Sequence, residues 1–193
     1  MTDGNPGSTA ELGAALVARA GELGIRVAVA ESLTGGLLAD AIVTVPGASR
    51  VFSGGIIAYD TALKAALLGV DVALLRERGP VDGDVAEQMA AGVRRACAVP
   101  PCAPAAGAAG READDRGAVA EAAWLGVATT GVAGPDPDPQ TGQPAGTVWV
   151  AVDAGGSRRA RRLQTSGGRA EIRSATVRAA LALALAALDP DQT

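Results

Sequence analysis

The sequence predicts an α/β fold in which helices cover both faces of a mostly parallel sheet that ends in an antiparallel hairpin. Short runs rich in β-branched residues alternate with longer segments of helical apolar spacing, as in parallel sheets. The core is expected to be aliphatic, because 48% of the 193 residues are hydrophobic and only 2% are aromatic. A domain usually has roughly 100 to 200 residues, so we expect a single domain over residues 1–193.

The first half of the chain is expected to alternate helix and strand. A helix should run from about Ser8 to Leu23, because Ser8 and Glu11 form a capping-box pattern, and Gly24 should end it. The following elements are expected to be a strand at 25–30, a helix after ESLTGG to about 43, a strand within 54–59, a helix at 60–68 capped by the aspartate at 60, a turn at 74–79 and a helix at about 83–98.

The second half is expected to begin with a mobile insert at about 99–122, where Ala, Pro, Gly and charged residues show no apolar period. A strand at 124–130 and a long Gly/Pro loop at 131–146 should follow. The remaining elements are expected to be an antiparallel pair of strands, at 147–153 and 159–165, and a helix at about 169–188.

Composition excludes several classes of function. A chain without histidine cannot be a Ser-His-Asp hydrolase or a histidine-ligated zinc enzyme. The net charge of −4 offers no broad attraction to nucleic acid. Cys97 and Cys102 are too few for a disulfide framework and lack a second pair of metal ligands. No signal-peptide pattern and no apolar run of about 20 residues is present, so we expect a cytoplasmic protein without a membrane span.

Polar residues that follow three predicted strands are the candidates for chemistry, since ligands of open α/β sheets bind beyond the carboxyl ends of strands. These residues are Ser32 in ESLTGG, Lys64 in AYDTALK and Thr130 in TTGVAGP. Lys64 is the only lysine among many arginines. It is a candidate base, because a desolvated amine can lose its proton whereas a guanidinium cannot. A helix cap for Ser32 and a solvated helix face for Lys64 are the alternative interpretations.

Neighbouring residues could bind a ligand. The glycines at 35–36 allow close backbone approach, and amides at the following helix start favour an anion, although a tight turn needs the same residues. Tyr59 could wall the pocket or pack in the core. The loop that begins at Gly131 could close over the pocket, and its Asp136 and Asp138 are interpreted as solvated turn residues.

Together these segments resemble the C-terminal domain of the CinA family. The resemblance extends from about residue 8 to 188, apart from the insert, and is carried by AESLTGGLLADAIVTVPGASRVFSGGIIAYDTALKAALLGV, LLRERGPVDGDVAEQMAAGVR, TTGVAGP and PAGTVWVAV, in the family's order. It implies a three-layer α/β/α sandwich with a mixed sheet and a homodimer. It also implies a stand-alone amidohydrolase that needs no metal or cofactor. Such enzymes convert nicotinamide mononucleotide to nicotinate mononucleotide and ammonia in pyridine-nucleotide recycling.

The resemblance also implies roles for individual residues. By motif, Ser32 would be the nucleophile, Lys64 its base and Thr130 the third polar member of the site. Backbone N–H groups near Gly131 or in the ESLTGG turn would stabilise the oxyanion. The substrate phosphate would lie on an arginine or near the start of the helix, at Thr34, Gly35 and Gly36.

Two positions depart from the family's pattern. Many relatives carry Cys where Leu33 stands, and most carry Ser where Asp82 stands. Asp82 could cap a helix as well as Ser does, but near a substrate phosphate its charge would weaken binding. A catalytically silent, competence-associated nucleotide-binding protein is therefore the alternative to the enzyme, and hydrolysis of a different small amide is a third possibility.

Overall fold

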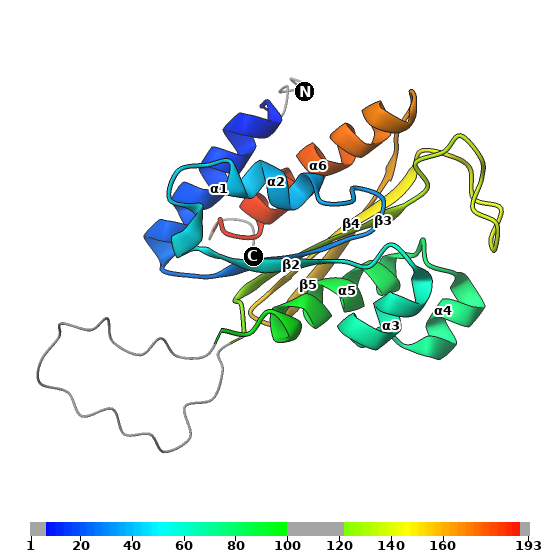
Figure 1. The fold of residues 1–193 in the computed structure, drawn as a ribbon, viewed down its shortest axis with the longest axis horizontal. Helices are drawn as coiled ribbons and strands as arrows, with labels where there is room; N and C mark the ends of the chain where they lie inside the picture. Colours follow the sequence, from blue (N-terminus) through cyan, green and yellow to red (C-terminus); the bar gives the residue numbers. More distant parts are fainter. Residues whose placement is uncertain (1–6, 100–121, 190–193) are drawn as a thin grey trace, which may run out of the picture.

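The computed structural model describes residues 7–99 and 122–189 of the chain. The predicted insert at about 99–122 lies almost entirely outside the described residues. Figure 1 shows three layers, in which one sheet lies between two groups of helices. The predicted α/β/α sandwich is therefore confirmed.

The sheet has five strands in the order β2-β1-β3-β4-β5. Strand β1 pairs in parallel with both β2 and β3, whereas β4 pairs antiparallel with β3 and with β5. Four strands therefore run in one direction, and only β4 runs against them. This confirms the mixed, mostly parallel sheet and the final hairpin. The strands are β1 (Val27–Glu31), β2 (Phe52–Ile57), β3 (Leu125–Gly131), β4 (Thr147–Ala154) and β5 (Ser157–Gln164).

The helices divide evenly between the two faces of the sheet (Figure 1). One face is covered by α1 (Thr9–Leu23), α2 (Leu37–Val43) and α6 (Arg169–Ala186), and the other by α3 (Thr61–Leu68), α4 (Val72–Arg78) and α5 (Gly83–Ala96). A short 3-10 helix, η1 (Ala48–Arg50), precedes β2. Each face has its own aliphatic core. Within residues 7–99 and 122–189, none of the helices has the length and apolar character that a membrane crossing requires.

Local capping signals explain where the helices begin. Ser8 and Glu11 form the expected capping box of α1, and Gly24 ends that helix with φ 65°. Asp60 caps α3 by accepting a hydrogen bond from the Ala62 N–H at 2.7 Å. Such caps satisfy N–H groups that the first turn of a helix leaves without partners.

One predicted element was wrong. The expected turn at 74–79 lies in helix α4, which begins after Asp71. The Asp71 carboxylate accepts a hydrogen bond from the Ala73 N–H at 2.7 Å, and Leu75 is buried against the core. A capping residue and one buried leucine are sufficient here, because tertiary packing stabilises a helix too short to form alone.

Two helical glycines provide a test of how closely α5 packs. A methyl group on Gly92 in α5 would collide with the backbone carbonyl of Leu68, whereas one on Gly21 in α1 would meet only Val51 Cγ1, at 3.9 Å. We expect Gly92→Ala to lower the free energy of unfolding by about 2 kcal/mol or more. Gly21→Ala, the matched control, should raise it by roughly 0.5 to 1 kcal/mol. Urea unfolding measures both, and equal effects would contradict this packing.

Candidate active site

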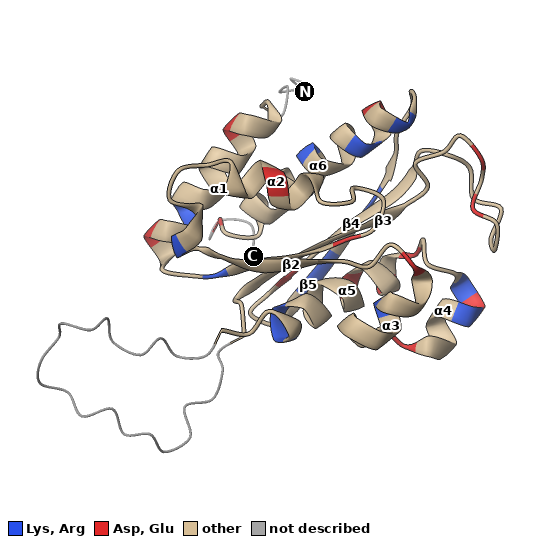
Figure 2. Cartoon of the chain, in the orientation of Figure 1, with Lys and Arg blue, Asp and Glu red and all other residues tan. Residues whose placement is uncertain are grey.

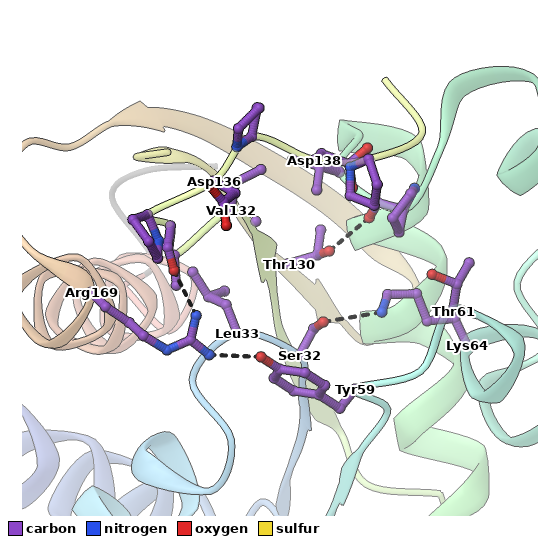
Figure 3. Close-up of a pocket in the computed structure, with 18 residues that line it drawn as sticks. Ser32, Leu33, Tyr59, Thr61, Lys64, Thr130, Val132, Asp136, Asp138 and Arg169 are labelled. Carbon is purple, nitrogen blue, oxygen red and sulfur yellow. Dashed lines mark hydrogen bonds between the residues drawn. The ribbon is translucent and has the colours of Figure 1, made fainter. Parts of the chain in front are cut away.

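The three residues that the sequence singled out meet in one pocket of about 380 Å³ (Figure 3). Ser32 follows the last residue of β1, Thr130 lies near the end of β3, and Lys64 lies in α3, which follows β2. Because these three strands are adjacent and parallel, their carboxyl ends share one edge of the sheet. The sheet topology therefore brings together side chains that are far apart in sequence.

Lys64 and Ser32 are in direct contact. The Lys64 Nζ lies 3.0 Å from the Ser32 Oγ and donates a second hydrogen bond, of 2.8 Å, to the Ala58 carbonyl oxygen. The Ala58 N–H in turn donates to the Glu31 carbonyl oxygen at 2.8 Å. The peptide groups of Ala58 thus tie the amine to the end of β1. Both side chains are shielded from water, with Lys64 only 1% exposed and Ser32 8% exposed.

Burial makes the neutral form of Lys64 accessible. Desolvation lowers the pKa of this amine from 10.5 to about 8, although the nearby negative charge of Asp60 partly opposes the shift. At pH 7 about one tenth of the amine is then neutral, compared with roughly three in ten thousand for an ordinary lysine. The neutral amine can accept the Ser32 proton, so the pair has the chemistry of a nucleophile and its base.

The turn that holds Ser32 is fixed by a residue that the sequence did not indicate. The buried Glu31 carboxylate accepts hydrogen bonds from the N–H groups of Gly36, Leu38 and Ala39, at 3.0, 3.1 and 2.8 Å. The Ser32 N–H is also held, since it donates to the Thr129 carbonyl oxygen at 3.0 Å. Usual capping signals lie within three residues of a helix start, whereas Glu31 acts from farther away.

This arrangement corrects the expected anion site at the start of α2. Its amides already bind a carboxylate of the chain itself, because Glu31 fills the place expected for the phosphate. Thr34, Gly35 and Gly36 are not among the residues that line the pocket. Thr34 is fully buried, with its hydroxyl 2.8 Å from that of Thr129.

Thr130 and Gly131 line the pocket as expected, but Thr130 does not contact the pair through a hydrogen bond. Its hydroxyl donates to the Pro80 carbonyl oxygen at 2.7 Å. Thr130 is 1% exposed, so this bond satisfies a donor that would otherwise be buried without a partner.

Tyr59 lies at the pocket mouth and not in the core, since it is 58% exposed. Its hydroxyl accepts a hydrogen bond from Arg169 Nη2 at 2.7 Å, and Arg169 Nη1 donates to the Gly134 carbonyl oxygen at 2.9 Å (Figure 3). Arg169 thereby connects two walls of the mouth. The sequence contained no signal for it, because only the fold places the start of α6 beside Tyr59.

The loop after β3 forms the opposite wall of the pocket. Asp136 and Asp138 both line it. Asp138 has the expected turn role, because its carboxylate accepts hydrogen bonds from the Gln140 N–H at 3.2 Å and the Thr141 N–H at 2.8 Å.

The two departures from the family's pattern lie in different places. Leu33 lines the pocket, whereas Asp82 does not. Asp82 caps α5 by accepting hydrogen bonds from the N–H groups of Asp84 and Val85, at 2.8 and 3.4 Å. Its carboxylate also lies 4.0 Å from Arg78. The charge of Asp82 is therefore used in capping the helix.

The cysteines lie apart from this pocket. Cys97 is half-buried and its thiol is free, and burial raises the pKa of that thiol. Cys102 lies outside the described residues. In the part of the chain that the structure describes, no three Cys, Asp or Glu side chains are grouped to hold a metal ion.

Comparison with known proteins points to one family. A family model described as the CinA C-terminal domain matches residues 9–120 and 115–188. A CinA-like protein of Frankia casuarinae is 40% identical over 157 residues, which are 81% of this chain and 30% of that protein. A CinA-like protein of Anaeromyxobacter sp. is 40% identical over 178 residues, which are 92% and 37%. The chain therefore spans about a third of the length of these curated relatives.

Solved structures show the same fold. A competence/damage inducible protein, CihA, of Agrobacterium tumefaciens has a TM-score of 0.78 and 31% identity, and the match covers 97% of this chain and 100% of that one. A CinA superfamily protein of Enterobacter cloacae has a TM-score of 0.80 and 25% identity, with coverages of 98% and 97%. The fold therefore agrees with these relatives over nearly its whole length.

Because the Lys64 amine is buried, we expect the free energy of unfolding to depend on pH. Since the pKa of Lys64 is about 8 in the folded chain and 10.5 ordinarily, the unfolded chain binds more protons between these values. The stability of the parent should therefore rise with pH through this range relative to Lys64→Met, by roughly 3 kcal/mol in full. Urea unfolding of both proteins near pH 7 and near pH 10 gives the difference in their unfolding free energies at each pH. The contributions of the other titrating groups are the same in both proteins and cancel in this difference. A difference that does not change with pH would contradict the lowered pKa.

Proposed function

Because the chain belongs to the CinA C-terminal domain family, we propose that it is a metal-independent amidohydrolase with nicotinamide mononucleotide as its substrate. The observation that carries this proposal is the buried Lys64 amine, with its pKa lowered to about 8, at 3.0 Å from the Ser32 hydroxyl. A serine and a desolvated lysine can perform nucleophilic catalysis without histidine, which this chain lacks.

The proposed reaction proceeds through an acyl-enzyme. The neutral Lys64 amine takes the proton of Ser32 as its Oγ attacks the carboxamide carbon. Lys64 then returns that proton to the nitrogen, and ammonia leaves as the tetrahedral intermediate collapses to an ester. A water molecule, deprotonated by the same amine, hydrolyses the ester and releases nicotinate mononucleotide. Thr130 forms part of the wall beside the reacting atoms.

Backbone amides beside the nucleophile are the candidate oxyanion donors. The Leu33 N–H directly follows Ser32 and makes no backbone hydrogen bond within the described residues. Leu33 and Gly131 both line the pocket, so their N–H groups are the proposed donors. Each such donor is typically worth about 3 kcal/mol of transition-state stabilisation.

Arg169 is the proposed contact for the substrate phosphate. Among the described residues it is the only arginine that lines this pocket, and its guanidinium lies at the mouth beside Tyr59. A guanidinium suits a phosphate because it donates in a planar fork.

The alternative of a silent nucleotide-binding protein was motivated by Asp82, and it loses that support because Asp82 caps α5 outside the pocket lining.

Three expectations about the whole molecule stay predictions. These are a single stand-alone domain, a homodimer and a cytoplasmic location. The names of the relatives state no reaction, so the amide substrate is also part of the proposal.

Ammonia release tests the assigned roles. The parent should release ammonia from nicotinamide mononucleotide, and Ser32→Ala should abolish release. Lys64→Arg should lower kcat by about a thousandfold or more, because arginine keeps the charge but cannot act as a base. Urea unfolding checks that the variant is folded under the assay conditions. Ser53→Ala is the control, since that hydroxyl has no hydrogen-bond partner within the described residues and lies outside the pocket lining. Release that survives both active-site substitutions would contradict these roles.

The pH profile tests the neutral amine independently. The kcat/KM should rise with pH through a midpoint of about 8, as Lys64 loses its proton. Asp60→Asn should move this midpoint to lower pH, because it removes the charge that raises the pKa of Lys64, while asparagine still caps α3. Asp71→Asn, at the cap of α4, is the matched control and should leave the midpoint in place. An unshifted midpoint in Asp60→Asn would show that another group limits the rate.

A further inference from the structure

A second cavity lies at the opposite end of β1 from Ser32. It has a volume of about 790 Å³ and is formed by α1, the turn into β1 and the segment from the end of α2 through η1. Its lining includes Arg26, directly before β1, whereas Ser32 directly follows that strand. The two cavities share no lining residue, so a ligand in one leaves the other open.

The floor of this cavity is apolar. Val17 and Val51 belong to the buried core, and Ile25 and Val45 pack against it. The volume lies within the range of about 300 to 1,000 Å³ that small-molecule sites occupy. The cavity can therefore accommodate an apolar or aromatic body of moderate size.

The rim of the cavity is positively charged. Arg26 and Arg50 line it, and no Asp or Glu within residues 7–99 and 122–189 does. Figure 2 shows basic positions at this end of α1 and around the start of β1, and also an acidic position near the end of α1. Within α1, Glu22 is paired with Arg19 at 3.1 Å. Within the described ranges, neither the Arg26 nor the Arg50 guanidinium makes a hydrogen bond or ion pair, so both remain available to a ligand. The Arg50 guanidinium also lies close over Gly47, since a Cβ at that glycine would be 2.9 Å from Arg50 Nη2.

We propose that this cavity binds a small organic anion, with an apolar body on the floor and a carboxylate, phosphate or sulfonate at Arg26 and Arg50. Two arginines without acidic partners favour an anion through charge-assisted hydrogen bonds, and the apolar floor favours burial of a ring or short chain. This site is separate from the proposed amidohydrolase pocket and does not depend on that activity.

Two dyes that differ only in charge test the proposal on the full chain. 8-Anilinonaphthalene-1-sulfonate carries an aromatic body and one sulfonate, and N-phenyl-1-naphthylamine is the same body without it. Fluorescence titration should show the sulfonate binding about tenfold or more tightly than the neutral dye. Equal affinities of the two dyes, or no binding of the sulfonate, would overturn the proposal.

Variants locate the binding. The double variant Arg26→Gln, Arg50→Gln should remove the preference for the sulfonate. The control double variant Arg76→Gln, Arg161→Gln loses the same charge from exposed surface outside this cavity, and it should keep the preference for the sulfonate. Gly21→Leu should weaken binding of both dyes, because its side chain replaces a glycine in the cavity lining.

The Gly21→Leu variant is expected to fold, because a Cβ at Gly21 meets only Val51 Cγ1, at 3.9 Å, and leucine favours a helix. Urea unfolding of the parent and of every variant confirms this. Unchanged dye affinity in Gly21→Leu would show that the dye binds elsewhere. An equal loss of affinity in both pairs of arginine variants would show that the dye responds only to net charge.

Discussion

The burial of one amine against one hydroxyl is the interaction on which the candidate site depends. A lysine that is 1% exposed is costly when charged, and this cost is what lowers its pKa to about 8. The Ala58 carbonyl and the Ser32 hydroxyl satisfy two of its hydrogen-bonding positions. The same desolvation that opposes folding therefore supplies a base near neutral pH. Such a conflict between stability and chemistry is typical of functional sites.

The surrounding structure fixes the positions of Lys64 and Ser32 relative to each other. Glu31 holds the turn after β1 through three backbone N–H groups, and the same residue's carbonyl accepts from Ala58, which holds the amine. Two neighbouring strands are thus linked directly at the site. Because the buried Glu31 carboxylate accepts hydrogen bonds from several backbone N–H groups, it holds this turn without needing another side chain as a partner.

The two ends of β1 have different characters. At the carboxyl end, the pocket combines a buried amine with a mouth where Arg169 and Tyr59 are joined. At the amino end, a larger cavity has an apolar floor and a rim with two arginines that have no partner in the part of the chain that the structure describes. The first arrangement suits chemistry on a small polar group, and the second suits recognition of an anion.

Local signals in the sequence were enough to predict the α/β class and most helix starts and to single out Ser32 and Lys64 as candidates, because capping, apolar period and residue chemistry depend on near neighbours. The pairing of Ser32 with Lys64 was implied by the family resemblance. Helix α4 was missed because its stability comes from packing. The roles of Glu31 and Arg169 were decided only by the tertiary structure. The hydrogen bond from Arg169 to Tyr59 spans 110 positions, and its geometry depends on which strands are adjacent and where their ends meet. Spacing along the chain carries no such information, since contacts between distant positions depend on how the strands are arranged in the folded sheet.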